Sequence, residues 1–375
     1  MKEIRAAIIG TGGIAHTHAK ALQSEGARIV AAADVDQTRV NEFCAQYGVA
    51  GAHTDVAAML AGAQPDLVHI CTPPGLHAAL CVQCLEGGAW VLCEKPLCGS
   101  LAELDQIQAA EDKTGNYCSP VLQWRFGSGS QHLKRLIEEQ AMGKPLVGIS
   151  QATWYRSPAY YEVPWRGKWA TELGGVTMSQ GIHVLDLLLW LMGDWREVHA
   201  MIGTLDRAIE VEDVSMAVVR FENGTMGSVI NSVLSPRQET YLRLDFQHAT
   251  VEATGLYTLS NKDWRYSIQE QSTSSDPLDY SMVSEVSYAD QLQQWQALPS
   301  EVATSHDSQI AALLDSMERN ERPLTSGIEA RRTLEFITCL YKSAMTGQPV
   351  ERGSLTPDDP FYGRIYGTAA QQTNA

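Results

Sequence analysis

The stretch IGTGGIAH places three glycines within four residues, directly after a run of aliphatic side chains. Gly10, Gly12 and Ala15 fit the spacing G-x-G-x-x-A, which is typical of a turn that receives a diphosphate. The first glycine permits a tight turn, the second lets the backbone approach the phosphates, and the small third residue lets a helix pack on the strand. We predict that this turn, with Gly13 and Ile14, binds a dinucleotide; a plain structural turn is the alternative.

The segment RIVAAA is followed by an acid, Asp34. A carboxylate at the end of the second strand of a dinucleotide-binding unit accepts hydrogen bonds from the adenosine ribose hydroxyls and repels a 2′-phosphate. The helix after Gly12 would direct its free N–H groups and the positive end of its dipole at the diphosphate. The sequence therefore predicts NAD as the cofactor, in preference to NADP.

Two further segments, CTPPGLH and CEKPLC, each follow an apolar strand-like run. Ligands of open α/β sheets bind at such strand ends, so we predict cofactor contacts from Thr72, Pro73, His77, Glu94 and Lys95. Lys95 stands between an apolar strand and a proline, so it is held in place. Its ammonium is predicted to face the crevice where a hydroxyl is oxidised, although a surface lysine in a turn is the alternative.

These motifs need a scaffold, and the first 120 residues or so alternate between strand-like and helix-like segments. The strands are short continuous apolar runs, as in parallel sheets buried on both faces. Such alternation indicates right-handed crossovers and a doubly wound, Rossmann-type α/β sheet. The predicted strands are 4–9, 28–33, 66–71, 90–93 and 117–122, and the predicted helices are 14–23, 38–47, 77–88 and 101–115.

The pattern changes at Gln123, so we predict two domains, a dinucleotide-binding domain over 1–122 and a second domain over 123–375. The second begins with helical and aromatic segments and then shows consecutive strand-like pieces between 196 and 268, with an Asn-Gly hairpin signal. It is predicted to be an α+β domain with a large, mainly antiparallel open sheet. The serine-rich span 267–287 is expected to be a loop.

The bulk composition excludes several classes of protein. The chain has 375 residues, of which 44% are hydrophobic, and a formal net charge of -16. This charge argues against binding to nucleic acid or to an anionic membrane surface. We count no apolar run near the roughly 18 residues that span a membrane, and the first residues do not resemble a signal peptide. The protein is expected in the cytoplasm, without membrane partners.

Eight cysteines, most of them in the first third of the chain, lie in apolar stretches. We interpret them as buried thiols in a reducing compartment. Cys81 and Cys84 have the spacing of a redox or zinc motif, which is the alternative. No metal is predicted, because we expect the following histidines not to form a ligand cluster: His16, His18, His77 and His306.

Taken together, the motifs GTGGIA, TPPGLH, EKP and GGVTMSQGIHVLDLLLWLMG resemble the Gfo/Idh/MocA oxidoreductases, in order and spacing, over nearly the whole chain. The resemblance implies that Lys95 of EKP and His183 of G-x-H-x-x-D are catalytic. Histidine suits the role of base near neutral pH, and the lysine would stabilise the developing alkoxide. Asp186 would orient a substrate hydroxyl or cap a polar edge of its helix, and Gln123 would contact cofactor or substrate.

The chain departs from this family at one position. Many members carry an aspartate four residues before the histidine, where it contacts substrate hydroxyls, and here that residue is Ser179. A serine can donate and accept hydrogen bonds but cannot act as a carboxylate base. We therefore predict that Ser179 contacts substrate and that His183 carries the proton transfer.

The stretch WYRSPAYYEVPWRGKW is dense in aromatic and basic residues. Aromatic faces stack on sugar rings, and arginine binds hydroxyls or a carboxylate. We predict substrate contacts from this stretch, with a merely structural interdomain loop as the alternative. The candidates are Tyr155, Arg156, Trp165 and Arg166.

The resulting prediction is an NAD-dependent oxidoreductase that transfers a hydride between nicotinamide and a secondary hydroxyl of a sugar, sugar derivative or cyclitol. Two alternatives remain at this point: a redox-neutral glycoside-cleaving enzyme with the same fold, and a cofactor-binding sensor without turnover. The resemblance also implies a homodimer or homotetramer built through the sheet of the second domain.

Overall fold

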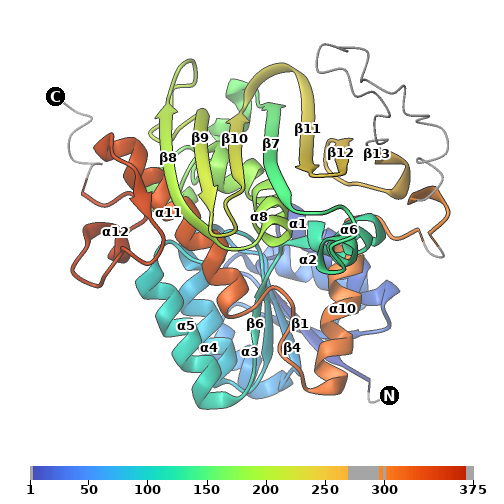
Figure 1. Cartoon of the computed structure of the whole chain (residues 1–375). Helices are drawn as coiled ribbons and strands as arrows, with labels where there is room; N and C mark the ends of the chain where they lie inside the picture. Colours follow the sequence, from blue (N-terminus) through green and yellow to red (C-terminus); the bar gives the residue numbers. More distant parts are fainter. Residues whose placement is uncertain (1–2, 269–294, 299–300, 369–375) are drawn as a thin grey trace, which may run out of the picture.

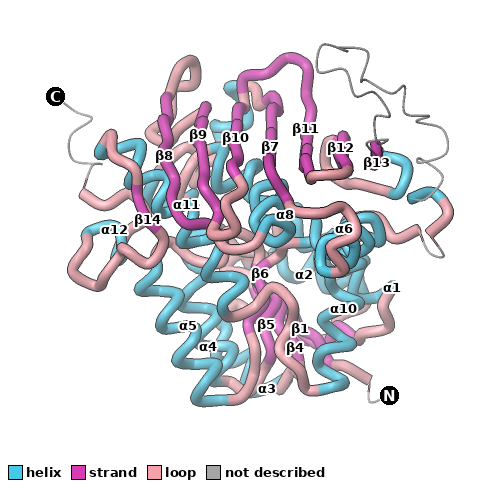
Figure 2. The backbone as a smooth tube through the Cα atoms, in the orientation of Figure 1, coloured by secondary structure: helices cyan, strands magenta, loops and turns pink. Residues whose placement is uncertain are grey.

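The computed structural model describes residues 3–268, 295–298 and 301–368. Two sheets, each with its own helices, lie one above the other in the views of Figure 1 and Figure 2. The loop predicted over 267–287 lies outside the described residues from position 269 onward. The predicted class, a doubly wound α/β sheet joined to a mainly antiparallel sheet, is confirmed.

The first sheet is parallel throughout and has the strand order β3-β2-β1-β4-β5-β6. Its central strands are buried on both faces, which explains their continuous apolar sequences. The short strand β3 was not predicted, because its Gly-Ala-His sequence is not an apolar run. The bounds are β1 Arg5–Ile9, β2 Arg28–Ala33, β3 Gly51–His53, β4 Leu67–Ile70, β5 Trp90–Cys93 and β6 Cys118–Pro120.

Five helices cross between these strands, and their ends follow from local sequence. Asp36 caps the start of α2, and Ser100 caps the start of α5 with its side-chain oxygen. The same two helices stop at Gly48 and Gly115, which adopt left-handed backbone angles of φ 67° and 74°. The bounds are α1 Gly13–Ser24, α2 Gln37–Tyr47, α3 Val56–Ala63, α4 His77–Glu86 and α5 Leu101–Thr114.

The second sheet has eight strands in the order β13-β12-β11-β7-β10-β9-β8-β14. All neighbours are antiparallel except β10 and β7, which are parallel. The bounds are β7 Pro145–Tyr155, β8 Trp195–Gly203, β9 Val214–Phe221, β10 Met226–Ser232, β11 Leu234–Phe246, β12 Ala249–Gly255, β13 Trp264–Ile268 and β14 Val350–Glu351.

One face of this sheet is covered and the other is open. In β9, Ala217, Val219 and Phe221 are buried, whereas the alternating Met216 and Val218 are 52% and 58% exposed. Helices α8 and α11 cover the buried face. The remaining bounds are η1 Pro74–Leu76, η2 Gln123–Phe126, α6 Ser128–Glu138, η3 Pro158–Glu162, α7 Trp169–Glu172, η4 Thr177–Gly181, α8 Ile182–Met192, η5 Asn261–Asp263, α10 His306–Arg319, α11 Ile328–Thr346 and α12 Pro360–Gly363.

The helical run Trp169–Met192 joins α7, the π-helical turn η4 and α8, and by length and composition alone it could cross a membrane. Polar residues such as Gln180 and Asp186 interrupt this run, so the search of the sequence for a continuous apolar run did not select it. In the protein, 89% of its apolar window is buried, because α8 lies between the second sheet and the rest of the chain. That position is typical of a core helix.

Helix α10 comes late in the chain but packs on α1 of the first region, as Figure 1 shows. Its Ile310 and Leu313 are buried in the same apolar cluster as Ala15, Ala19 and Leu22. The first region therefore includes a segment from beyond residue 122. The predicted domain boundary at residue 122 itself stays a prediction.

Candidate active site

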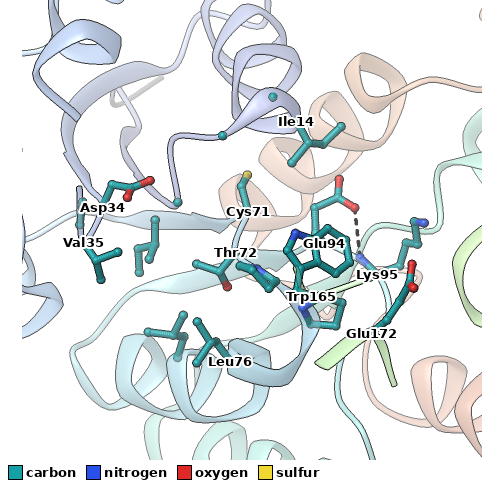
Figure 3. Close-up of a pocket in the computed structure, with 18 of the residues that line it drawn as sticks. Ile14, Asp34, Val35, Cys71, Thr72, Leu76, Glu94, Lys95, Trp165 and Glu172 are labelled. Carbon is teal, nitrogen blue, oxygen red and sulfur yellow. Dashed lines mark hydrogen bonds between the residues drawn. The ribbon is translucent and has the colours of Figure 1, made fainter. Parts of the chain in front are cut away.

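A cavity of ≈ 840 Å³ runs along the carboxyl ends of the first sheet toward the second region. Asp34 and Val35 lie at one end, and Lys95, Trp165 and Glu172 lie at the other (Figure 3). The cavity is thus lined by residues from both predicted domains. It also contains most of the positions that the sequence singled out for cofactor binding.

The glycine turn forms one wall of this cavity. Gly10 has φ +83°, and a Cβ built on it would lie 2.9 Å from the Cys71 backbone, so a side chain is excluded. Gly12 and Gly13 differ, because a Cβ on either would meet no described atom within 4 Å. The space in front of these two glycines, at the start of α1, leaves room for a diphosphate to approach the backbone.

Asp34 is held by the turn itself. Its Oδ2 accepts hydrogen bonds from the Thr11 N–H at 2.8 Å and the Thr11 hydroxyl at 3.0 Å. Burial alone would raise the pKa of this carboxyl, but hydrogen bonds from Asp36 and Thr11 and the nearby Arg39 charge lower it overall. Arg39, which lies 3.3 Å from Asp34 and also lines the cavity, was missed at the sequence level.

Three apolar side chains are unusually exposed because they face this cavity. Ile14 is 38% exposed, Val35 92% and Leu76 54%. Apolar walls beside a glycine turn and a carboxylate suit a ligand with flat rings joined by phosphates. The residues present therefore fit a dinucleotide. Thr72 and Pro73, two of the predicted cofactor contacts, lie in the lining.

Lys95 lies in the loop after β5, and its ammonium donates a hydrogen bond to the Ser179 carbonyl oxygen. Burial lowers the pKa of Lys95, and Arg166 and Arg156 lower it further, while Glu94 opposes the shift. Ser179 lies one helical turn before His183, so this contact ties the loop to the helix that carries the predicted base.

His183 is the second residue of α8, and its ring stacks on Trp124 with ring centroids 6.5 Å apart. Burial and the Lys95 charge lower the pKa of His183 to about 3. The imidazole is therefore neutral at physiological pH and able to accept a proton. Its Nδ1 is buried and has no hydrogen-bond partner in the described part of the chain, although His183 is not among the described residues that line the cavity.

The aromatic stretch contributes Trp165 and Arg166, two of the four predicted substrate contacts, to the lining. The Arg166 guanidinium lies over the ring of Tyr160 at 3.9 Å and over the ring of Trp165 at 4.2 Å. It also pairs with Glu172 at 3.1 Å. Tyr160 and Glu172 line the cavity too; sequence reasoning missed them, although Tyr160 lies inside the stretch that it selected.

Ser179 lines the cavity, but its hydroxyl is already engaged. Its oxygen lies 2.7 Å from the Gly175 carbonyl oxygen and 2.5 Å from the Gln180 side-chain oxygen, and its single proton is donated to one of these two acceptors. The predicted contact between Ser179 and substrate would therefore need the hydroxyl either to accept from substrate or to give up an existing bond.

Asp186 is buried and does not line the described cavity, which favours a structural role over the predicted contact with a substrate hydroxyl. It is 0% exposed, and both of its oxygens accept from the Arg125 guanidinium at 2.6 and 2.7 Å. Thr333 donates a further hydrogen bond at 2.6 Å. The spacing from His183 placed Asp186 on the same helix face, but the buried Arg125 of η2 draws the carboxylate into the core.

Four other predicted contacts lie outside the described lining of the cavity. His77 is 0% exposed and bridges the Pro96 and Thr72 carbonyl oxygens at 2.7 and 2.8 Å, so it fixes two cavity loops rather than facing a ligand. Gln123 is buried. The Tyr155 ring lies near the Arg207 guanidinium. The Arg156 guanidinium lies over Trp154 at 5.0 Å and over Tyr160, a lining residue, at 5.3 Å, so it stands beside the cavity wall.

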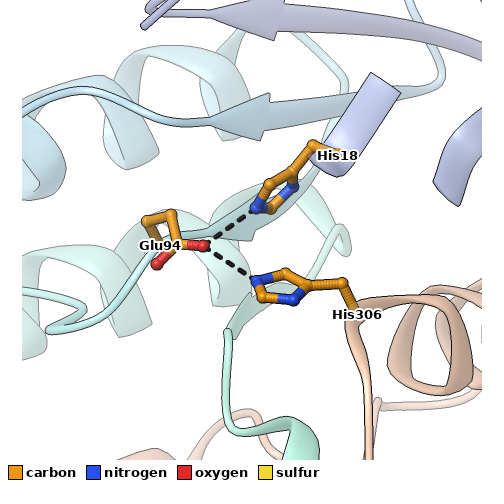
Figure 4. A group of neighbouring side chains, drawn as sticks. All are labelled: His18, Glu94 and His306. Carbon is orange, nitrogen blue, oxygen red and sulfur yellow. Dashed lines mark hydrogen bonds and ion pairs between the residues drawn. The ribbon is translucent and has the colours of Figure 1, made fainter. Parts of the chain in front are cut away.

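The histidines are arranged differently from our expectation. His18 and His306 both contact Glu94, through Nε2 atoms that lie 2.9 and 3.2 Å from the same carboxylate oxygen (Figure 4). The three ligating atoms lie within 4.8 Å of one another, so two of the four histidines do belong to a possible ligand cluster. We call these three side chains the Glu94 cluster.

All eight cysteines lie in the described part of the chain, where each is free and buried. Burial raises the pKa of Cys81 and Cys84, which suppresses the reactive thiolate form. This environment supports packed thiols rather than a redox motif.

Comparison with known proteins agrees with this arrangement. Residues 4–121 match the oxidoreductase family with an NAD-binding Rossmann fold, and residues 130–254 match the GFO/IDH/MocA C-terminal domain. A D-apiose dehydrogenase of Paraburkholderia graminis is 27% identical over 369 residues, which cover 96% of this chain and 92% of that protein. A myo-inositol 2-dehydrogenase of Thermotoga maritima is 27% identical over 237 residues, or 61% and 68% of the two chains.

Among solved structures, the WlbA dehydrogenase of Chromobacterium violaceum, in complex with NADH and UDP-GlcNAcA, superposes with a TM-score of 0.81 at 26% identity. The match covers 95% of this chain and 98% of that one. The resemblance drawn from the motifs is thus confirmed over both regions. The chain belongs to the Gfo/Idh/MocA family of oxidoreductases and carries its NAD-binding Rossmann domain.

Proposed function

We propose that this protein is an NAD-dependent dehydrogenase that oxidises a secondary hydroxyl of a sugar, sugar derivative or cyclitol. The observation that carries the proposal is the single cavity of ≈ 840 Å³ that joins the glycine turn and Asp34 to Lys95 and Trp165. One ligand with phosphates and one with hydroxyls can meet there. The relatives named for apiose and inositol support the choice of substrate class.

The cofactor would be held along the first sheet by the open backbone at Gly12 and Gly13, with its ribose near Asp34 and its rings against Val35 and Leu76. When bound, the nicotinamide supplies the hydride acceptor that the protein itself lacks. The remaining work falls to the side chains at the Lys95 end, which must orient a hydroxyl, accept its proton and exclude water.

Lys95 would donate a hydrogen bond to the reacting oxygen and stabilise negative charge as it develops. The neutral imidazole of His183 would accept the hydroxyl proton. With its pKa lowered to about 3, His183 is a weak base, so the proton transfer is favourable only if Lys95 stabilises the alkoxide at the same time. The two residues act as one unit, consistent with the contact that ties Lys95 to the helix of His183.

Asp34 supports NAD in preference to NADP, because a carboxylate kept charged by Thr11 and Asp36 would repel a 2′-phosphate. Arg39 works in the opposite direction, since its guanidinium is half exposed on the same cavity wall. The expected preference for NAD is therefore finite and depends on the balance of these two charges.

Trp165 and Arg166 support a ring-shaped, hydroxyl-rich substrate. The Arg166 guanidinium is fixed between two aromatic rings and a carboxylate, so it presents its remaining N–H groups at low entropic cost. An aromatic face beside such a donor is a common arrangement for sugars.

The direct test is a screen of purified protein against sugars, sugar acids and cyclitols with NAD⁺, followed by NADH absorbance. The expected result is NADH formation with at least one member of these classes. Free reducing sugar without NADH would instead indicate redox-neutral cleavage, and the absence of any turnover despite NAD⁺ binding would indicate a sensor. Either outcome contradicts the proposal.

Two further expectations concern the oligomeric state of the protein and its location in the cell. The open face of the second sheet, with Met201, Met216, Val218 and Met226 more than half exposed, supports a homodimer or homotetramer formed through that face. Light scattering of the wild-type protein and of Met216→Glu tests it, and a monomeric wild type would contradict it.

The eight free thiols support a cytoplasmic location, which cell fractionation tests.

A further inference from the structure

The Glu94 cluster joins three distant parts of the chain. His18 comes from α1, Glu94 follows β5, and His306 is the first residue of α10. Figure 4 shows both imidazoles directed at one carboxylate. The other Glu94 oxygen accepts a hydrogen bond from the backbone N–H of Lys95 at 3.2 Å. The cluster is therefore attached directly to the predicted catalytic lysine.

The hydrogen bonds fix where the protons of this cluster lie. A carboxylate only accepts, so His18 and His306 must each donate from Nε2. The Nδ1 of a neutral His18 then has to accept from Nδ1 of His69, 2.9 Å away. This leaves Nε2 of His69 as a buried lone pair, and no partner for it exists among the described residues. Two buried neutral imidazoles thus support one charged carboxylate.

The pKa shifts have the direction that this arrangement requires. Burial lowers the pKa of His18 and lowers that of His69 further, which keeps both rings neutral. Burial alone would raise the pKa of Glu94, but the hydrogen bonds from His18 and His306 hold it well below the ordinary value. The buried rings of His18 and His69 therefore leave the negative charge of Glu94 in place, and the buried Lys95 ammonium is a cation that interacts with it.

This charge faces the cavity at its Lys95 end. Asp34 and the glycine turn mark the opposite end as the place for the adenosine half of a dinucleotide, so the Lys95 end must receive the nicotinamide half. The other charged side chains that line this end are Lys95, Arg166 and Glu172, of which the last two pair at 3.1 Å. The Arg156 charge also acts here, since it lowers the pKa of Lys95.

We propose that Glu94 is a specificity-determining residue that raises the affinity for the oxidised coenzyme relative to the reduced one, with His18 and His306 as positioning residues that keep its carboxylate charged and in place. This proposal rests on the proposed function. The nicotinamide ring is a cation when oxidised and neutral when reduced, so a fixed anion beside it stabilises only the first form. The Glu94 carboxylate does not have to touch the nicotinamide ring, because electrostatic attraction acts through space.

A metal ion is the competing occupant of the cluster. The spacing of the three ligating atoms would permit one, but the distances of 2.9 and 3.2 Å are those of hydrogen bonds. A divalent cation would also add positive charge beside Lys95 and beside an oxidised nicotinamide. Without a metal ion, the Glu94 cluster keeps the negative charge that favours the oxidised nicotinamide ring.

The test is to measure the dissociation constants of NAD⁺ and NADH for the full chain, by calorimetry or fluorescence quenching, in wild type and Glu94→Gln. The expected result is a rise of about tenfold in the ratio Kd(NAD⁺)/Kd(NADH) in the variant, as removal of one nearby unit charge should give. A ratio within twofold of wild type, with both coenzymes bound, would overturn the proposal. If wild type bound neither coenzyme, the proposed function itself would fail.

Glu111→Gln is the matched control. Glu111 is a buried carboxylate of the same region that pairs with Arg322 at 2.7 Å but does not line the cavity. Its ratio should stay within twofold of wild type, and a change as large as that of Glu94→Gln would overturn the assignment to one residue.

Two further measurements test the proposal independently of the Glu94→Gln variant. If Glu94→Gln does not fold, His306→Ala takes its place, because His306 is partly exposed and donates one hydrogen bond to Glu94. The ratio is then expected to shift in the same direction by a smaller amount. An unchanged ratio overturns the proposal. Dialysis against a chelator, with or without added Zn²⁺, should leave the wild-type ratio unchanged. A ratio that changes on chelation and returns with Zn²⁺ would assign the cluster to a metal.

Discussion

The two ends of the active-site cavity are built in different ways. The adenosine end is mainly backbone: the turn at Gly10 and Gly12, the start of α1, and one carboxylate that the turn itself holds. The other end consists of side chains from separate elements, including Lys95, Trp165 and Arg166. A backbone site depends on neighbours in sequence, whereas a side-chain site depends on how distant segments pack. The two ends should therefore fail in different ways when they are altered.

The largest effect is expected at the side-chain end. His183→Ala and Lys95→Ala should each lower kcat by at least ~100-fold, because each removes a group that acts on the proton or the charge of the reacting hydroxyl. The dissociation constant for NAD⁺ should change little. Steady-state kinetics on the substrate found in the screen provide the measurement, and near-normal turnover in either variant would contradict the assigned roles.

The buried ion pair between Asp186 and Arg125 should contribute to the stability of the fold. Asp186→Asn leaves the Arg125 guanidinium with Glu329 as its remaining charged partner, and we expect the free energy of unfolding to fall by about 2–3 kcal/mol. Chemical denaturation measures this change. A large loss of kcat in a protein of unchanged stability would instead return Asp186 to the substrate site.

Two glycines give a matched pair at the backbone end. Gly12→Ala adds a Cβ that projects into open space, so the fold should keep its stability while the affinity for NAD⁺ falls about tenfold, as an added methyl in a fitted site costs. Gly10→Ala, with φ +83° and the Cys71 backbone 2.9 Å away, should lower the melting temperature as well. Equal effects of the two substitutions on stability would contradict this distinction.

The smallest effect concerns the choice between coenzymes. Asp34→Ala should lower the ratio Kd(NADP⁺)/Kd(NAD⁺) by up to about tenfold, the value of a hydrogen bond to a charged group. Arg39→Ala should move the same ratio in the opposite direction, because it removes the only positive charge among the described residues that pair with Asp34. Unchanged discrimination in Asp34→Ala would remove the role that we assign to this carboxylate.

The difference between the two ends also explains what the sequence predicts. Gly10, Gly12 and Asp34 belong to one strand–turn–helix–strand unit, so their spacing in sequence implies their arrangement in space. Lys95 and Trp165 were found because motifs or composition mark them. The strands and helices of the first region were predicted for the same local reasons, except the short strand β3 and the short helix α3.

The remaining features depend on contacts that sequence spacing does not contain. Asp186 follows His183 by three residues, yet Arg125, 61 residues away, determines where its carboxylate lies. His306 reaches Glu94 across 212 positions. Tyr160 lines the cavity because of how the loop folds back and not because of its immediate neighbours. Each of these is a property of tertiary packing.

The return of α10 to the first region limits how this protein can be divided. Ile310 and Leu313 complete the apolar interior around α1, and His306 completes the Glu94 cluster. A fragment ending at residue 122 would expose that interior to water. A chimera that takes its first 122 residues from a relative would have to take residues 306–319 from the same relative, so the two halves are not exchangeable modules.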